Sequence, residues 1–382
     1  MGNTYVKLQT QLMREYYKDF SKYARGKAPA NKVAWVTAFA PVEILEALDI
    51  AYYYPESYAA VIAASQKEQA FLEVSGCKDL SLDCCSYSCC MEGCLELSEG
   101  PRGIPPKPDI LIATNNQCNT LPAWWNILSE RFGIPFVIID YPGERADRKA
   151  AFEYVTGQHM SLIEQLEKLS GNKLEFERLE SLIRISRQSV EAWERVRVCL
   201  VSYDVTLTTL FDDISFLITA RCKPQTSELY GMLEEKIKER KSFNDGRIPL
   251  FWLGYPLWYH EKRYLEEYLS DFHIVGSNYI TWWSLDYSGS TVYEQLFQAY
   301  NFTFLNLSQN SRNRYLEECI NQSGAICAVA VHNKSCKCDF VSTKGITIPY
   351  VELELDMIDR AFMDKDRILR LIEMLKETVC TE

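Results

Sequence analysis

The sequence predicts an α/β protein with two similar Rossmann- or flavodoxin-like domains, each built on a parallel sheet and joined by a helical linker. Three observations support this fold class. Apolar runs of strand length alternate with helical patterns in the first and last parts of the chain, the middle part shows helical periodicity alone, and the two outer parts repeat each other loosely. Fully apolar strands separated by helices are typical of parallel sheets covered on both faces.

The first domain is expected over residues 1–151. Three apolar runs of strand length predict buried strands at 32–37, 108–114 and 133–140. A helix is predicted after the first strand, because Pro41 stands early and Glu43 lies in the first turn, and both features favour a helix N-terminus.

Residues 152–244 are expected to form a helical connector, because apolar side chains recur there at helical spacing between charged ones. The second α/β domain is expected over residues 245–382. Its predicted strands are 248–253, 272–275, 325–331 and 345–354.

The repeat places a cysteine after an equivalent strand in each domain. PDILIATNNQC ends at Cys118, and AICAVAVHNKSC ends at Cys336. Open α/β sheets bind ligands beyond the carboxyl ends of their strands, at a topological switch point. The sequence therefore predicts a site at these two loops.

Composition and missing motifs exclude several function classes. With 41 basic and 52 acidic residues the net charge is -11, which argues against nucleic acid or an anionic membrane as a main partner. No apolar run reaches the length of a membrane span, and the polar N-terminus lacks a signal-peptide core, so a cytoplasmic protein is expected. Because neither G-x-x-x-x-G-K-[ST] nor G-x-G occurs, any ATP is expected to bind another chain.

The chain contains 14 cysteines, which in a reducing compartment indicate metal or redox chemistry before disulfides. Six fall within 18 residues: Cys77, Cys84, Cys85, Cys89, Cys90 and Cys94. No C-x-x-C is present, so any ligands must come from distant loops. An iron–sulfur cluster, a structural zinc site and thiols without metal all remain open.

Three cysteines stand in polar loops and are the candidate ligands, namely Cys85 or a near neighbour, Cys118 and Cys336. Three thiolates would leave one iron of a [4Fe–4S] cluster without a cysteine. Such an iron can act as a Lewis acid as well as carry an electron.

Five motifs, in order along most of the chain, resemble the 2-hydroxyacyl-CoA dehydratase and benzoyl-CoA reductase family. They are CSY (85–87), NNQCNTLPAWW (115–125), GIPFVIIDYP (133–142), HNKSCK (332–337) and IPYVELELDMIDR (348–360). The resemblance is weakest between about residues 152 and 245, and it favours an iron–sulfur cluster over the alternatives.

The resemblance implies an iron–sulfur subunit that pairs with a homologous second subunit, or with itself. It implies a CoA thioester as substrate and an ATP-dependent iron–sulfur activator as electron donor. The electron would enter the thioester carbonyl, giving a ketyl radical that expels the 2-hydroxyl, or beginning ring reduction in the reductases.

By motif, Cys85, Cys118 and Cys336 would hold the [4Fe–4S] cluster, as cofactor-binding and metal ligands. Glu43 and His332 would be catalytic: Glu43 reaching the iron or substrate, His332 donating to a thioester oxygen or a sulfide. The structural alternatives are a helix-turn glutamate and a loop histidine with a structural hydrogen bond.

Extra thiols beside Cys85 leave two other functions open. One is a stand-alone reductase with a double-cubane cluster, for which the cysteines suffice in number. The other is a non-catalytic subunit whose cluster relays electrons or acts as a scaffold. Tryptophans near strand ends are expected mostly in the core, with one or two lining an acyl pocket.

Overall fold

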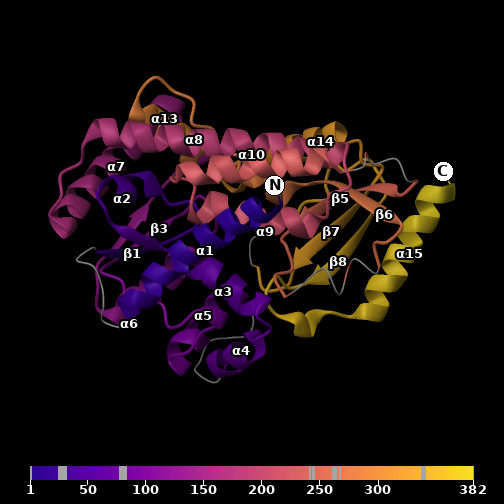
Figure 1. The fold of residues 1–382 in the computed structure, drawn as a ribbon, viewed down its shortest axis with the longest axis horizontal. Coiled ribbons are helices and arrows are strands. Elements are labelled where there is room, and N and C mark those ends of the chain that lie inside the picture. The colour runs from indigo at the N-terminus through magenta and orange to yellow at the C-terminus, as the bar shows by residue number, and fades with distance from the viewer. Residues whose placement is uncertain are drawn as a thin grey trace.

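Two four-stranded parallel sheets surrounded by helices make up the fold, in a computed structural model that describes residues 2–24, 32–76, 84–240, 242, 246–259, 265, 268–336 and 341–381 (Figure 1). All strand pairs in both sheets are parallel. The predicted fold class is confirmed. Cys77 and Cys338 lie outside the described residues.

The first sheet has the order β2-β1-β3-β4, formed by β1 (Val33–Val36), β2 (Ala51–Tyr53), β3 (Ile110–Thr114) and β4 (Phe136–Ile139). Its predicted strands are present, and β2 is an additional short one. The helices of this part are α1 (Gly2–Ala24), α2 (Val42–Ala47), α3 (Pro55–Ala64), α4 (Glu68–Gly76), α5 (Ser86–Leu97) and α6 (Thr120–Phe132).

The second sheet has the order β6-β5-β7-β8, formed by β5 (Ile248–Gly254), β6 (Phe272–Ser277), β7 (Cys327–Asn333) and β8 (Tyr350–Leu355). This is the strand order of the first sheet, so the repeat read from the sequence is a repeat of topology. Its helices are α12 (Asn278–Trp282), α13 (Val292–Asn301), α14 (Gln309–Ser323) and α15 (Lys365–Thr381).

Four helices lie between the sheets in sequence: α7 (Arg148–Ser170), α8 (Phe176–Val198), α9 (Leu207–Thr219) and α10 (Pro224–Lys238). Helix α8 contacts α2 at the first sheet, and the 3-10 turn that continues it, η2 (Cys199–Val201), contacts β6 of the second. Figure 1 shows α8 and α10 side by side along one edge of the molecule. The helical region thus bridges both sheets, while the boundaries at 151/152 and 244/245 stay predictions.

The strands of both sheets contribute to one cluster of buried hydrophobic residues. The apolar sequences of the central strands explain why these strands are buried. The side chains of β1 are all buried, and those of β7 are buried as far as Val331, as expected for central strands of covered parallel sheets. The described residues also contain three further 3-10 turns: η1 (Gly143–Arg145), η3 (Phe304–Asn306) and η4 (Arg360–Phe362). Among the described helices, none combines the length and apolar character needed to cross a bilayer.

Candidate functional site

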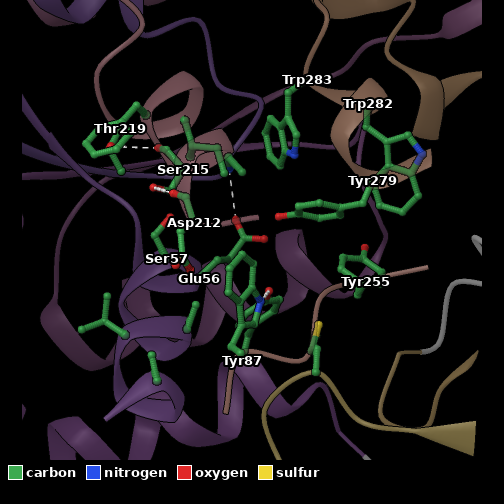
Figure 2. A pocket seen from close by; sticks show the side chains of 18 of the residues that line it. Glu56, Ser57, Tyr87, Asp212, Ser215, Thr219, Tyr255, Tyr279, Trp282 and Trp283 are labelled. Atoms are coloured by element: carbon green, nitrogen blue, oxygen red, sulfur yellow. Dashed lines mark hydrogen bonds between the residues drawn. The ribbon is translucent and has the colours of Figure 1, made fainter. Parts of the chain in front are cut away.

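A cavity of about 740 Å³ lies where strands of both sheets end. Its lining side chains follow those strands: Phe39 after β1, Glu56 after β2, Cys118 after β3, Tyr255 after β5, Tyr279 after β6 and Cys336 after β7. Helices α1 and α9 also contribute lining residues. Figure 2 shows Asp212, Ser215 and Thr219 of α9 on one side of the cavity and Trp282 and Trp283 on the other.

The three cysteines predicted from the loops, Cys85, Cys118 and Cys336, all line this cavity. Cys85 is the residue that precedes α5, Cys118 lies in the loop between β3 and α6, and Cys336 follows β7. The structure therefore brings together thiols that are up to 251 residues apart (336 minus 85). Two come from the first sheet's part of the chain and one from the second.

Hydrogen bonds between neighbouring serines hold the Cys85 and Cys336 loops together. The Ser86 N–H donates to Ser335 Oγ at 3.1 Å, and the Ser335 hydroxyl donates to Ser86 Oγ at 3.0 Å. Asp356, at the end of β8, accepts from the Ser335 N–H at 3.2 Å. Both serines are buried, so these bonds are shielded from water and fix the two thiol-bearing loops.

Glycine shapes the part of the cavity wall that contains Tyr255. Gly254 ends β5 with φ of 117°, in the left-handed region, and a Cβ there would lie 2.4 Å from the Val331 carbonyl oxygen. Only glycine fits this close approach of the backbones. The turn delivers Tyr255 to the cavity lining.

Burial raises the pKa of the Cys85 thiol well above its ordinary value, and the nearby Cys336 adds to this effect. Desolvation favours the neutral thiol, and a second thiolate would repel the first. Both thiols could be held as thiolates if a positive metal centre offset this cost.

Glu56 is a buried carboxyl group in the cavity that the sequence analysis did not identify. Its Oε2 accepts from the Ala38 N–H at 3.0 Å, and its Oε1 accepts from Gln117 Nε2 at 2.7 Å. Burial raises its pKa to about 7. Figure 2 shows the Tyr279 hydroxyl directed toward this carboxyl group. A carboxyl group with a pKa near neutrality can both give and take a proton.

Glu43 does not line the cavity. It is fully buried, and its carboxylate accepts hydrogen bonds from Ser186 at 2.8 Å, Tyr287 at 2.7 Å and Tyr300 at 2.5 Å, with Arg221 Nε at 3.3 Å. Burial alone would raise its pKa, but Arg221 and the tyrosine hydroxyls lower it below its usual value. These contacts match the alternative of a structural glutamate, although one held in an extensive buried network.

His332 also lies outside the cavity lining. It is in β7, is about one-third exposed, and its Nε2 lies 3.4 Å from Glu352 Oε1 on β8. Four further cysteines near Cys85 do not line the cavity either: half-buried Cys84 and buried Cys89, Cys90 and Cys94 of α5. Cys94 instead donates to the Glu99 carbonyl oxygen.

A single metal ion and an iron–sulfur cluster need different arrangements of ligands. Within the described part of the chain, no group of three histidine, cysteine, aspartate or glutamate side chains is close enough to hold one metal ion. A zinc site needs its ligands about 2.0–2.3 Å from one centre, whereas each cysteine of an iron–sulfur cluster binds a different iron. Cys85, Cys118 and Cys336 are the residues that would hold such a cluster, because all three line the cavity.

The fold and site define a two-sheet α/β protein with a cysteine-lined cavity at the carboxyl ends of its strands. The family model described as 2-hydroxyglutaryl-CoA dehydratase, D-component, matches residues 37–375. The chain belongs to this family, and it is a subunit of the 2-hydroxyacyl-CoA dehydratase type, to which a related CoA-thioester reductase subunit is also similar.

Curated relatives agree with this placement. The alpha subunit of (R)-2-hydroxyisocaproyl-CoA dehydratase from Clostridioides difficile is 26% identical, covering 96% of this chain and 95% of the relative. The alpha subunit of lactoyl-CoA dehydratase from Anaerotignum propionicum is 25% identical over 92% of each chain. One of the subunits of benzoyl-CoA reductase from Thauera aromatica is 23% identical over 61% of this chain and 56% of its own.

Proposed function

We propose that this chain is the α-type subunit of a 2-hydroxyacyl-CoA dehydratase and that Cys85, Cys118 and Cys336 hold a [4Fe–4S] cluster. The observation that carries the proposal is that these three thiols, from both sheets, line one cavity. Dehydration is favoured over ring reduction because two dehydratase alpha subunits match 96% and 92% of the chain, whereas the reductase subunit matches 61% of it.

When bound, such a cluster supplies one-electron chemistry and an iron that can act as a Lewis acid. In the net reaction the C2–O bond breaks and a β-proton is lost, giving an enoyl thioester and water. The reaction is redox-neutral overall, so the electron that starts it is recovered at the end of each turnover.

Glu56 is the group of this chain best suited to move a proton in that reaction. It lies in the cavity lining with Cys85, and the Ala38 N–H and the Gln117 amide orient its two oxygens. With a pKa of about 7, raised by burial, it can accept a proton and release it again.

The two cations of the described cavity lining, Arg14 of α1 and Arg102, are both exposed, so they mark its opening. Arginine binds phosphate through paired N–H donors, so these side chains suit the phosphate groups of coenzyme A. The thioester would then enter the cavity with its acyl end toward the cysteines.

Two further proteins complete the proposed system. The relatives are named as alpha subunits, which supports a homologous partner subunit. The sequence contains no Walker A motif, which supports a separate ATP-hydrolysing protein as the source of the electron.

The test is anaerobic purification of the complex of this chain with its partner, followed by iron quantitation on this chain alone and assay with the activator. We expect about four iron per chain, as a [4Fe–4S] cluster requires. Cys85→Ser, Cys118→Ser and Cys336→Ser should each lower iron content and turnover. Cys327→Ser, buried in β7 away from the cavity lining, is the matched control and should retain both.

Iron-free wild-type protein from iron-replete anaerobic expression would overturn the proposal. About eight iron per chain in a homodimer would favour the double-cubane reductase, because that cluster needs roughly twice the thiolates. Full turnover after Glu56→Gln, with loss of stability when iron is removed, would favour the relay or scaffold subunit.

A further inference from the structure

We propose that the inner part of the cavity selects an uncharged 2-hydroxyacyl group with a bulky apolar side chain and rejects one that carries a second carboxylate. This inference rests on the proposed function and goes further by naming the substrate class. The charge distribution, the aromatic wall and one unpartnered indole carry it.

Charge is separated along the cavity. The charged lining residues in the described chain are Arg14, Arg102, Asp212 and Glu56. The first three are exposed, whereas Glu56 is only 7% exposed. The inner lining of the described residues therefore offers no cation to a second carboxylate, and its one ionisable carboxyl group would repel it. Burying an unpaired carboxylate is strongly unfavourable.

Aromatic rings form the inner wall. Phe39, from the turn after β1, stacks on Trp283 with ring centroids 4.5 Å apart and planes 18° from parallel. Tyr279 lies within 6.1 Å of Trp283 and 5.4 Å of Trp282, measured between ring centroids. Figure 2 shows the side chains of Tyr279, Trp282 and Trp283 gathered on the side of the cavity that faces Glu56. Such a surface gains free energy by covering an apolar side chain of similar size.

Two aromatic side chains of the cavity lining form a hydrogen bond with each other. Trp258 Nε1 donates to the Tyr87 hydroxyl at 2.7 Å. This bond joins the part of the chain that carries the first sheet to the part that carries the second, and it keeps both rings in place. These rings therefore present apolar surface to a ligand.

Trp283 offers a polar group to a ligand in the cavity. Its side chain is only 6% exposed, it lines the cavity, and its Nε1 has no hydrogen-bond partner in the structure. A buried indole N–H usually finds an acceptor. An oxygen of the 2-hydroxyacyl thioester would satisfy it, and a single neutral N–H would not neutralise a second carboxylate.

The test measures binding with unreactive analogues, so that it does not depend on turnover. The iron-loaded, anaerobic complex with its partner is titrated calorimetrically with saturated thioesters that lack the 2-hydroxyl. We expect 4-methylpentanoyl-CoA and 3-phenylpropanoyl-CoA to bind at least about 100-fold more tightly than glutaryl-CoA, because glutaryl-CoA buries an unpaired charge. Propanoyl-CoA should fall between them, because it covers less apolar surface.

Trp283→Phe keeps the ring stack and removes the N–H. This variant should bind all four thioesters about 10-fold more weakly than the wild type, and the order of their affinities should stay the same. Trp124→Phe is the matched control, because the Trp124 indole donates to Glu92 at 3.1 Å and lies outside the cavity lining. It should bind all four thioesters like the wild type.

The outcomes separate this inference from the proposed function. Glutaryl-CoA binding as tightly as the apolar thioesters, or no thioester binding to the iron-loaded complex, would overturn the inference. The predicted ranking together with no dehydration of any 2-hydroxyacyl-CoA would support the inference and contradict the proposed function. If Trp283→Phe binds all four thioesters as tightly as the wild type, the Trp283 indole N–H does not contact the ligand, and that part of the inference is overturned.

Discussion

The hydroxyl groups of Ser86 and Ser335 lie 3.0 Å apart, although 249 residues separate them in sequence. Each serine neighbours a cysteine of the cavity, Cys85 in one case and Cys336 in the other. A buried hydrogen bond that involves neither thiol therefore joins the two loops that carry Cys85 and Cys336.

Ser335→Ala should therefore loosen the two thiol loops. We expect a loss of about 1–3 kcal/mol in the free energy of unfolding, because two buried polar groups lose their partner. We also expect faster loss of iron to a chelator, followed anaerobically by absorbance. Ser323→Ala is the control, because the buried Ser323 bonds only near its own helix end. Equal rates of iron loss in both variants would show that the hydrogen bond between Ser86 and Ser335 does not hold the two thiol-bearing loops together.

Glu43 and Arg221 form a buried ion pair that joins α2 to the residues before α10. Glu43→Gln should cost about 3–5 kcal/mol of stability, because it leaves Arg221 charged without its partner. The double variant Glu43→Gln, Arg221→Met should recover part of that loss in anaerobic urea denaturation. If the double variant loses more free energy of unfolding than the two single variants lose together, the two side chains do not stabilise each other.

His159 makes stability depend on pH. Its Nε2 lies 2.8 Å from the Tyr141 hydroxyl, and burial lowers its pKa from 6.5 to about 4. In the unfolded chain it takes up a proton below about pH 6.5, whereas in the fold it stays neutral until about pH 4. Stability should therefore fall as pH drops through that window, by about 3 kcal/mol in total from this group.

The check is urea denaturation at pH 7.5 and pH 5 for the wild type and for His159→Gln, which cannot titrate. The loss of stability between these two pH values should be smaller in the variant by about 2 kcal/mol, because pH 5 lies inside the window. Equal pH effects in both proteins would show that His159 is not held neutral.

Glu56→Gln should lower turnover by about 10²–10⁴-fold, the usual contribution of a positioned proton carrier. Because glutamine is isosteric, affinity for an unreactive thioester should change little. The ionisation near pH 7 in the wild-type pH–rate profile should disappear, because burial sets the Glu56 pKa to about 7. Glu130→Gln, on the exposed side of α6, is the control. A profile that keeps this ionisation would assign it to another group.

Much of the fold could be predicted because strand signals in a covered parallel sheet are strong. Residues 110–113 and 327–331 are apolar throughout, and the cysteines a few residues beyond these strands follow the rule for switch points. Strand β2 was missed because Ala51–Tyr53 has only three residues and no alternating pattern.

Glu56 was not predicted as a site residue because it follows β2, the strand that the sequence did not predict. Pro41 with Glu43 and Pro55 with Glu56 are similar helix starts in sequence, but one carboxyl group faces Arg221 and the other faces the cavity. Which way each faces depends on packing between distant elements, and no local pattern encodes it. The serine bond between the loops depends on tertiary structure in the same way.

The division of the three thiols between the two halves of the chain bears on how the protein is made. Cys85 and Cys118 are translated before Cys336, which follows Cys118 by 218 residues (336 minus 118). Any group that all three thiols must hold can be inserted only after the strand that precedes Cys336 has been made. Chains that terminate before Cys336 therefore cannot hold the group with all three thiols.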